Sequence, residues 1–557
     1  MNRLALPTIL CSAFLLCANP SDSGELRDPP PLPSGGSGVA RPLEPAIDAP
    51  ARVGEAPTAL RAGAPTPLAA AGGASDAPRL AFDGIINTTV SITPPDTHIA
   101  VGRGYGSTGR VVMVTNLSAG IWDKHGNPVV SPLSLGSMFG ADVFDPKVLY
   151  DQHSDRFFIV ALEGKSSTPG LSVIHIAVSF DGAPDDLASD WTFLSGSAVT
   201  TVGGTSTWAD YPGIGADASA LFVTTNLFTF TASAFKGMKI RVFDKADLLA
   251  GIYGYSDLDY DASSIDVATT QPAHVFAATS NGAFYLISRI DASSYRLFAV
   301  SGHPSAPTAT TNTFPWSGGL YPANDGADQC DQVQPDVATL SARVQSAVYR
   351  DGQIWLTLTS DPDEDGETEV VWQQIASNGY PLSNPSVTQA GYLDGTGTDA
   401  WTYLPSLNVN AAGDAAIVYT QSSATECPNM YYATRAASDS AGSFRDPIAQ
   451  RLSDGFYDSF RSDNPDRWGD YAAVVIDPSD DCFWLASEFV WSSTVAGSDW
   501  GTHVANVCSY LPVPALPAPY LLGLALSLAF AAAHRYSPRG TSRHPLARMQ
   551  SSSCARE

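Results

Sequence analysis

The motif Trp-x-Asp-Tyr occurs twice in the sequence and places an acidic side chain at the same point of two similar segments. Its copies are residues 208–211 and 468–471. Three comparable segments contribute one aspartate each. Together with the two motif copies they give the candidate aspartates Asp96, Asp145, Asp210, Asp336 and Asp470. If these segments lead into inner strands around one axis, the carboxylates meet at a channel mouth, where they can bind Ca²⁺ or act as an acid and base pair. The alternative is that each aspartate ends a loop and caps a hairpin.

A second group of acids lies in residues 360–372, whose sequence is SDPDEDGETEVVW. Its alternating aspartates followed by Gly366 have the spacing that opens an EF-hand loop. An EF-hand needs an acid where Trp372 stands, so that motif is excluded. The segment predicts either a looser Ca²⁺ site or a solvated acidic loop, and the candidate ligands are Asp361, Asp363, Asp365 and Glu369. Calcium is the one cofactor that the sequence suggests.

Several common catalytic motifs are missing from the sequence. It contains no Gly-x-Ser-x-Gly, no His-Glu-x-x-His and no dinucleotide-binding fingerprint. The complete repeats and the arginine segment expected of a sialidase are not found either. Glycosidase chemistry by another pair of carboxylates stays open, because such pairs have no fixed spacing along a chain.

The cysteines predict two disulfides. Four lie between residues 330 and 508: Cys330, Cys427, Cys482 and Cys508. An even number in an exported protein favours disulfides, and four cysteines allow three connectivities. We predict that Cys482 pairs with Cys508, because these two bracket the last repeat, and that Cys330 therefore pairs with Cys427.

Short strands must position all of these residues. From residue 79 to residue 510 the chain alternates runs rich in Val, Ile, Tyr, Phe and Thr with turns rich in Gly, Asp, Asn and Pro, which predicts an all-β domain. Similar segments recur at intervals of about 50 to 70 residues, with anchors at Pro95, Pro146, Pro212, Pro272, Pro335, Pro405 and Ala472. This period predicts a β-propeller-like fold with six or seven blades. The last unit is short, and we expect residues 79–92 to complete it.

Both ends of the chain predict targeting to the cell envelope. Residues 1–19 have the layout of a signal peptide, and residues 20–78 are rich in Pro, Ala, Gly and Ser, which predicts a disordered linker. Residues 511–557 contain a Pro-rich lead, an apolar transmembrane segment at 520–533 and a basic cytoplasmic tail. This order resembles the C-terminal sorting signals of Gram-negative envelope proteins, which a protease can cut to release the protein.

Several segments, in their order along the chain, resemble a group of uncharacterised secreted bacterial repeat proteins. The segments include TPPDTHIAVGRG, VFDPKVLYDQHSDRFFIVAL and RWGDYAAVVIDPSDDCFW, and the resemblance spans residues 93–490. It implies a shared all-β fold and export from the cell, and it assigns no catalytic residue. The acidic insertion DPDEDGETE departs from the pattern of the group.

The charge and the predicted location limit the function. Acids outnumber bases by 56 to 30, which gives a net charge of −26, so nucleic acid is excluded as a partner and divalent cations are attracted. We expect an exported, membrane-anchored protein that binds a surface ligand, either carbohydrate or protein. The alternative is a carbohydrate-active hydrolase, sialidase-like or another glycosidase. Two carboxylates with an arginine in a deep pocket would favour the hydrolase, whereas a shallow aromatic or acidic rim would favour binding.

Overall fold

The computed structural model describes residues 73–508, with gaps at 88–93, 165–167, 278–281, 317–325, 332–334, 341–342, 460–464 and 495–496 and at positions 266, 268, 292 and 398. The predicted signal peptide, nearly all of the predicted linker and the predicted transmembrane segment lie outside the described residues. Within the described part of the chain, no helix is long and apolar enough to cross a membrane.

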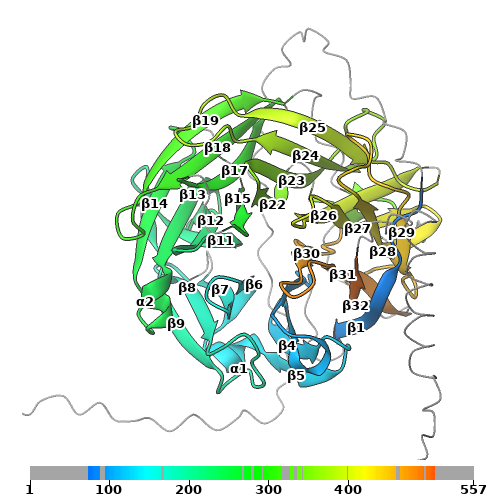
Figure 1. Ribbon diagram of the computed structural model, residues 1–557, viewed down its shortest axis with the longest axis horizontal. Coiled ribbons are helices and arrows are strands. Elements are labelled where there is room, and N and C mark those ends of the chain that lie inside the picture. The colour runs from blue at the N-terminus through cyan, green and yellow to red at the C-terminus, as the bar shows by residue number, and fades with distance from the viewer. Residues whose placement is uncertain are drawn as a thin grey trace, which may run out of the picture. The chain divides into compact units, whose positions relative to one another are not determined.

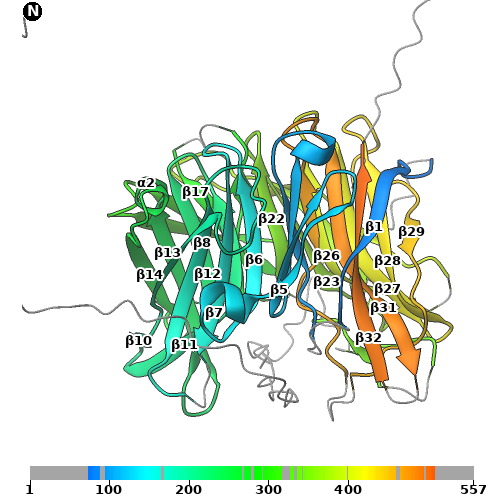
Figure 2. The same cartoon turned by 90° about the horizontal axis from the view of Figure 1, so that it is seen from below.

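Seven β-sheets follow one another around a common axis (Figure 1), and their strands run side by side along that axis (Figure 2). Each sheet has four or five strands, and almost all neighbouring strands are antiparallel. The fold is therefore a seven-bladed β-propeller, which confirms the predicted propeller and decides between the six and seven blades that the repeat interval allowed. An additional two-stranded sheet pairs β20 (Gly326–Ala327) with β21 (Val337–Ala338).

The blades are numbered in chain order. Blade 1 consists of β2 (His98–Val101), β3 (Arg110–Thr115), β4 (Ser118–Asp123) and β5 (Pro128–Ser134). Blade 2 consists of β6 (Val143–Asp151), β7 (Arg156–Gly164), β8 (Ser172–Ser179) and β9 (Trp191–Ser197). Blade 3 consists of β10 (Thr200–Val202), β11 (Thr205–Ala216), β12 (Ala220–Thr229), β13 (Phe235–Asp244) and β14 (Tyr255–Asp261). Two α-helices, α1 (Leu135–Phe139) and α2 (Lys245–Leu249), and the 3₁₀ turn η2 (Gly106–Thr108) lie in connections.

Blades 4 to 7 complete the ring. Blade 4 consists of β15 (Thr270–Pro272), β17 (Phe284–Asp291), β18 (Ser294–Ser301) and β19 (Thr308–Pro315). Blade 5 consists of β16 (His274–Val275), β22 (Val344–Arg350), β23 (Gln353–Ser360), β24 (Glu369–Ala376) and β25 (Ser386–Leu393). Blade 6 consists of β26 (Ala400–Val409), β27 (Ala415–Ser423), β28 (Glu426–Arg435) and β29 (Ile448–Arg451), and blade 7 consists of β30 (Ala473–Ile476), β31 (Phe483–Thr494), β32 (Gly497–Val507) and β1 (Pro78–Ile86).

Burial explains the sequence of the central strands. All six residues of β3 are buried, whereas β5 at the outer edge of the same blade is almost entirely exposed. A central strand packs against blades on both of its faces, so it is apolar without strict alternation. The hydrophobic core accordingly consists of clusters that join neighbouring blades, such as the cluster that contains Val112 of blade 1 and Ile159 of blade 2.

The anchors of the repeat mark the inner strands in six of the seven blades. Pro146, Pro212, Pro272 and Pro405 lie within inner strands, and Pro95 and Ala472 come shortly before inner strands. The seventh anchor is placed wrongly by the sequence pattern. Pro335 leads into β21 of the two-stranded sheet, whereas the inner strand of blade 5 is β22, which begins at Val344.

The last blade is closed by the N-terminal strand, as predicted. Strand β1 pairs antiparallel with β32, and Leu80 lies opposite Asn506. The blade thus takes three strands from one end of the domain and one from the other, which covers the edge of β32 and closes the ring. Both predicted disulfides, Cys482–Cys508 and Cys330–Cys427, are present.

Buried ion pairs join the inner turn of one blade to the next blade. Asp151 accepts hydrogen bonds from its own turn and from Lys245 of blade 3, whose ammonium lies 2.7 Å away. Asp477 of blade 7 pairs in the same way with Lys124 of blade 1, at 2.7 Å. All four side chains are at most 4% exposed. These two turn aspartates therefore also connect neighbouring blades.

Candidate functional site

Four of the five predicted aspartates come together where inner strands of the propeller begin. Asp96 precedes β2, Asp145 lies near the start of β6, Asp210 lies in β11 and Asp470 precedes β30. They belong to blades 1, 2, 3 and 7, and the charge of Asp145 interacts with those of the other three. We call these four residues the axial aspartates.

Hydrogen bonds across blade boundaries hold two of the axial aspartates. The backbone N–H of Asp470 donates to Asp96 Oδ1 at 2.9 Å, and the N–H of Tyr211 donates to Asp145 Oδ2 at 3.3 Å. Asn116 lies between them: its Nδ2 donates to Asp96 Oδ2 at 2.9 Å, and its Oδ1 accepts from the N–H of Asp145 at 3.3 Å. These aspartates therefore join neighbouring blades and do not simply cap their own hairpins.

Four residues in or just before inner strands have a strained backbone. Asp96, Asp145, Tyr211 and Leu404 have φ values of 50°, 48°, 54° and 51°. Non-glycine residues rarely adopt this left-handed region, and each such residue costs about 1 to 3 kcal/mol. This conformation recurs in or just before four inner strands, and in three of them it lies at or directly after an axial aspartate.

Three further charged residues complete the cluster. Lys147 Nζ lies 3.1 Å from the ring centre of Tyr471, and the guanidinium of Arg467 pairs with Asp470. Glu488 is fully buried and accepts a hydrogen bond from the N–H of Thr97 at 3.0 Å. These three residues were not among those predicted from the sequence. The available signal was weak: Arg467 precedes the second Trp-x-Asp-Tyr copy directly, and Lys147 follows an Asp-Pro pair.

Burial and crowding of negative charge shift the acid–base properties of the cluster. Burial, together with the charges of nearby aspartates, raises the pKa of Asp145 well above its usual range. Burial likewise raises the pKa of Asp210 to about 6 and that of Glu488 to about 7, and it lowers the pKa of Lys147 to about 7. Asp145 and Asp210 also share a side-chain hydrogen bond. Several groups that can gain or lose a proton near neutral pH thus lie at one place.

Asp336 does not belong to this cluster, which corrects the sequence prediction. It lies directly before β21, because the seventh anchor leads into the two-stranded sheet. Its backbone carbonyl accepts a hydrogen bond from Asp466 N at 2.7 Å, and the charge that acts on its carboxyl group is that of Asp328.

A cavity of about 390 Å³ lies on the axis beside the cluster and is lined by residues from all seven blades. Lys147 forms part of its wall. Three other wall residues, Gln271, Gln345 and Arg350, each have a buried nitrogen without a hydrogen-bond partner among the described residues. Buried polar groups normally have partners, so these nitrogens favour water or a polar ligand in the cavity.

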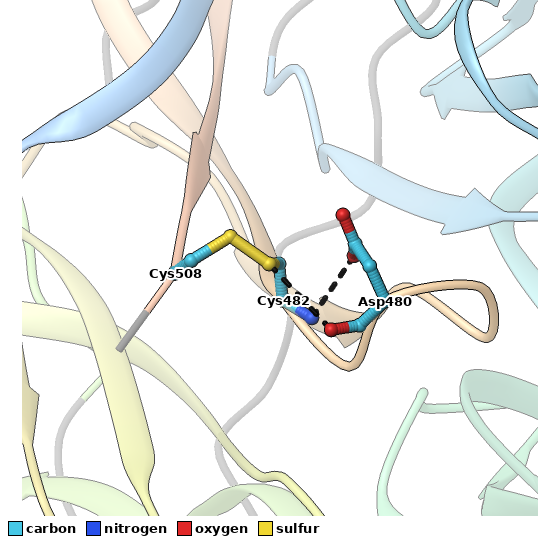
Figure 3. Close-up of side chains that lie close together, drawn as sticks. All are labelled: Asp480, Cys482 and Cys508. Carbon is cyan, nitrogen blue, oxygen red and sulfur yellow. Dashed lines mark hydrogen bonds between the residues drawn. A yellow bond between two sulfur atoms is a disulfide. The ribbon is translucent and has the colours of Figure 1, made fainter. Parts of the chain in front are cut away.

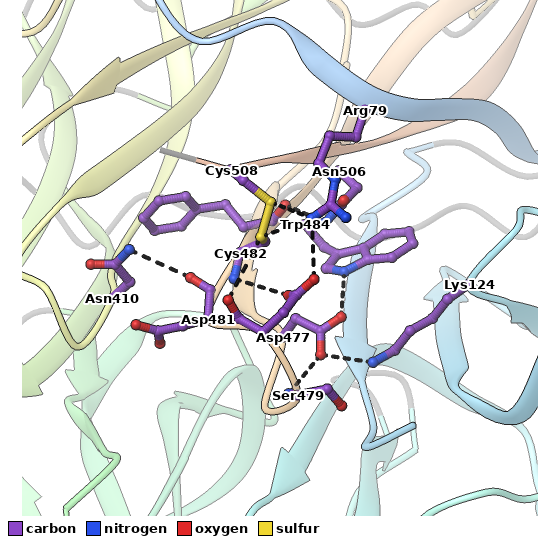
Figure 4. The surroundings of a disulfide bond; sticks show 12 residues. Arg79, Lys124, Asn410, Asp477, Ser479, Asp481, Cys482, Trp484, Asn506 and Cys508 are labelled. Atoms are coloured by element: carbon purple, nitrogen blue, oxygen red, sulfur yellow. Dashed lines mark hydrogen bonds and ion pairs between the residues drawn. A yellow bond between two sulfur atoms is a disulfide. The ribbon is translucent and has the colours of Figure 1, made fainter. Parts of the chain in front are cut away.

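The Cys482–Cys508 disulfide lies near other residues of the cavity wall. Arg79 Nη1 lies 3.2 Å from Asp480 Oδ2 and 2.7 Å from Cys508 Sγ (Figure 4). Asp480 also accepts a hydrogen bond from the N–H of Cys482 at 3.2 Å (Figure 3). Both sulfur atoms are in the disulfide, so this group offers no thiolate to a metal. Its role in the fold is to fasten the first residue before β31 to the first residue after β32.

The acidic loop of blade 5 also places predicted residues together. Carboxylate oxygens of Asp361, Asp363 and Glu369 lie within 4.8 Å of one another. Asp365 is near enough to act electrostatically on Glu369, but it is not part of the group of three.

No family model and no curated protein matches the chain. Among solved structures it is similar to a GH43 endo-arabinanase from Bacillus licheniformis, with 12% identity, 54% of this chain and 96% of that chain covered, and a TM-score of 0.27. It is also similar to the Trypanosoma rangeli sialidase, with 9% identity, 74% and 60% coverage and a TM-score of 0.33. It is similar as well to the phage phi92 endosialidase, with 11% identity and a TM-score of 0.34; the match covers 66% of this chain and 68% of that chain. These similarities to propeller glycosidases are too distant to assign an activity.

Proposed function

We propose that the protein is a carbohydrate-active hydrolase whose acid and base are carboxyl groups of the axial aspartates. The observation that carries this proposal is the hydrogen-bonded pair of Asp145 and Asp210 beside the Arg467–Asp470 ion pair. Burial and the charges of nearby aspartates favour the protonated form of Asp145 by raising its pKa, whereas Asp210, with a pKa of about 6, is largely ionised at neutral pH. Once a bound glycan separates the pair, the protonated carboxyl group can donate its proton to the leaving oxygen while the ionised one activates water, since such groups flank a glycosidic bond about 5 Å or more apart.

The substrate class follows from the surroundings of the pair. Gln271 and Gln345 bring unpartnered amide nitrogens to the adjacent cavity, and hydroxyl groups of a sugar can accept from them. A volume of about 390 Å³ lies within the range of small-molecule sites. The net charge of −26 disfavours polyanionic substrates, so a neutral glycan is the best fit.

A second candidate function is glycan binding without hydrolysis. The observation that favours it is the polar wall of the cavity, which could hold a sugar without any proton transfer. In that case Gln271→Ala and Gln345→Ala each weaken binding about tenfold, since each loses a hydrogen bond to the ligand.

The test uses the purified full-length protein on a panel of neutral aryl glycosides and on a glycan array. For a hydrolase, Asp210→Asn and Asp145→Asn lower kcat/KM by about a hundredfold or more, while Asp210→Asn still binds the glycan. Asp217→Asn is the matched control, because Asp217 lies seven residues after Asp210 and holds only a turn through Ser219 and Ala220. Binding by the wild type without turnover supports the second candidate, and neither binding nor turnover refutes both.

We further propose that the protein acts outside the cytoplasm and is held at the cell envelope by its C-terminal apolar segment. The two disulfides support an oxidising compartment. Fractionation of cells that express the full chain tests this proposal. Recovery of the protein with reduced cysteines in the cytosol would refute it.

A further inference from the structure

The loop between β23 and β24 of blade 5 brings three carboxylates to one point at the blade 5 and blade 6 boundary. Asp361 follows β23 directly and Glu369 is the first residue of β24, so the two stand at the two ends of the loop. Asp363 projects from the loop, and carboxylate oxygens of the three residues lie within 4.8 Å of one another. Oxygens that share one Ca²⁺ at about 2.3 to 2.6 Å lie at most about 5 Å apart, so this separation fits a single ion.

Glu369 supplies independent evidence for a missing ligand. Its side chain is 1% exposed, and its Oε2 has no hydrogen-bond partner among the described residues. The charged groups that act on it are Asp361, Asp363, Asp365 and Asp394, all of them acidic. A buried carboxyl group that faces other acids without a partner is costly unless a cation or a proton compensates it.

We propose that Asp361, Asp363 and Glu369 bind one Ca²⁺ ion, with Asp365 and Asp394 adding negative charge around it. The cluster contains only oxygen ligands, which suit a hard cation and give no advantage to zinc or copper. Mg²⁺ is a weaker candidate, because it demands near-ideal octahedral geometry and keeps most of its water.

The loop is already held in place around this site. Asp361 accepts from the N–H of Glu364 at 2.6 Å and from that of Gly366 at 3.2 Å. At the other end of the loop, the N–H of Thr402 in β26 donates to Thr368 O at 2.7 Å, and the N–H of Val370 donates to Thr402 Oγ1 at 2.8 Å. An ion at Glu369 therefore fixes a hairpin of blade 5 that already contacts blade 6. Its expected role is to stabilise the ring, and it is independent of the proposed hydrolase activity.

Thermal unfolding of the purified full chain tests the site. Chelator-treated protein is melted with excess EGTA, with Ca²⁺ and with Mg²⁺ at equal concentration. We expect Ca²⁺ to raise Tm by several degrees and Mg²⁺ to raise it less, since an ion that binds only the folded state stabilises it by mass action. Glu369→Gln removes a ligand and should weaken Ca²⁺ binding by more than about tenfold, as direct ligands matter at least as much as their supporting groups.

The matched control is Glu364→Gln, which removes one charge from the exposed tip of the same loop and should keep the Ca²⁺ response. Glu369→Gln should fold, and in EGTA its Tm should equal or exceed that of the wild type, because the unpartnered buried acid is gone. The proposal is refuted if the wild type gives no Ca²⁺ shift, or if Glu369→Gln keeps the whole shift. An equal response to Mg²⁺ would refute the assignment to calcium.

Terbium luminescence gives a second measurement. Tb³⁺ occupies Ca²⁺ sites, and Tyr392 is close enough for its phenol to be affected by the charges of Asp363, Asp394 and Glu369. Tyrosine excitation should therefore sensitise Tb³⁺ bound to the wild type, and Ca²⁺ should displace the ion. Equal sensitised emission from Glu369→Gln would place the ion elsewhere and overturn the proposal.

Discussion

Replacing Asp210 by asparagine should stabilise the folded protein at alkaline pH. The folded carboxyl group has a pKa of about 6, above the ordinary value of 3.8. The folded state therefore binds this proton more tightly than the unfolded state does. Above pH 6 the ionised group penalises folding, and the penalty disappears as the pH falls from 6 towards 3.8. Asparagine cannot ionise, yet its oxygen can still accept the hydrogen bond that Tyr211 N donates at 3.0 Å.

The size of the effect follows from the two pKa values. They differ by about 2 pH units, and each unit corresponds to about 1.4 kcal/mol, so the penalty is about 3 kcal/mol above pH 7. This value is an upper limit, because Asp210 interacts with Asp145 and Asp470. When one member of the cluster changes, protons redistribute among the others. We expect Asp210→Asn to gain about 1 to 3 kcal/mol at pH 8 and almost nothing at pH 4.

Urea unfolding of the wild type and of Asp210→Asn at pH 4, 6 and 8 measures this difference. Acids that titrate in both proteins, such as Asp151, contribute equally to the pH dependence of both, so their contributions cancel in the difference. The control Asp217→Asn lies in the same blade outside the cluster and should show the pH profile of the wild type. A variant that is less stable than the wild type at pH 8 would show that the Asp210 carboxylate supports the fold, and the argument for a strained functional acid would be wrong.

Three other changes test the architecture and one tests the chemistry. Lys245→Met leaves the buried Asp151 without its ion-pair partner and should lower the free energy of unfolding in urea by about 3 to 5 kcal/mol. The control Lys236→Met, at a pair whose side chains are 23% and 19% exposed, should lower it by less than about 1 kcal/mol. Equal losses would contradict the role of burial. Replacing Cys482 and Cys508 together by serine opens a loop with a sequence separation of 26 and should cost about 3 to 4 kcal/mol; an unchanged unfolding midpoint would argue against it. Deleting residues 73–86 removes β1 and exposes the edge of β32, so light scattering should detect aggregation, and a soluble, stable monomer would show that blade 7 closes without it. If the proposed hydrolysis occurs, kcat/KM should fall below pH 6 as Asp210 gains its proton, and a flat profile from pH 5 to 7 would exclude Asp210 as the base.

Much of the fold could be predicted because a propeller repeats a local pattern. Alternating apolar runs and turn residues specify strands, and the recurrence of Pro146, Pro212 and Pro405 marks three of the inner strands. The short last unit predicted that the N-terminal strand completes blade 7, since a ring cannot leave one blade unfinished. The error at Pro335 has a clear cause: the same proline signal can open any extended segment, and here the following residues pair with β20.

The sequence by itself predicted the strands, the period, both disulfides and five candidate aspartates, of which the tertiary structure brings four together. Only the tertiary structure decided that Asp96 and Asp470, 374 residues apart, share a hydrogen bond, because ring closure sets blade 7 against blade 1. It alone added Lys147, Arg467 and Glu488, whose neighbours come from other blades. The physical reason is that local patterns fix backbone conformation over a few residues, whereas burial and the pKa of a carboxyl group depend on every charge that packing brings near it.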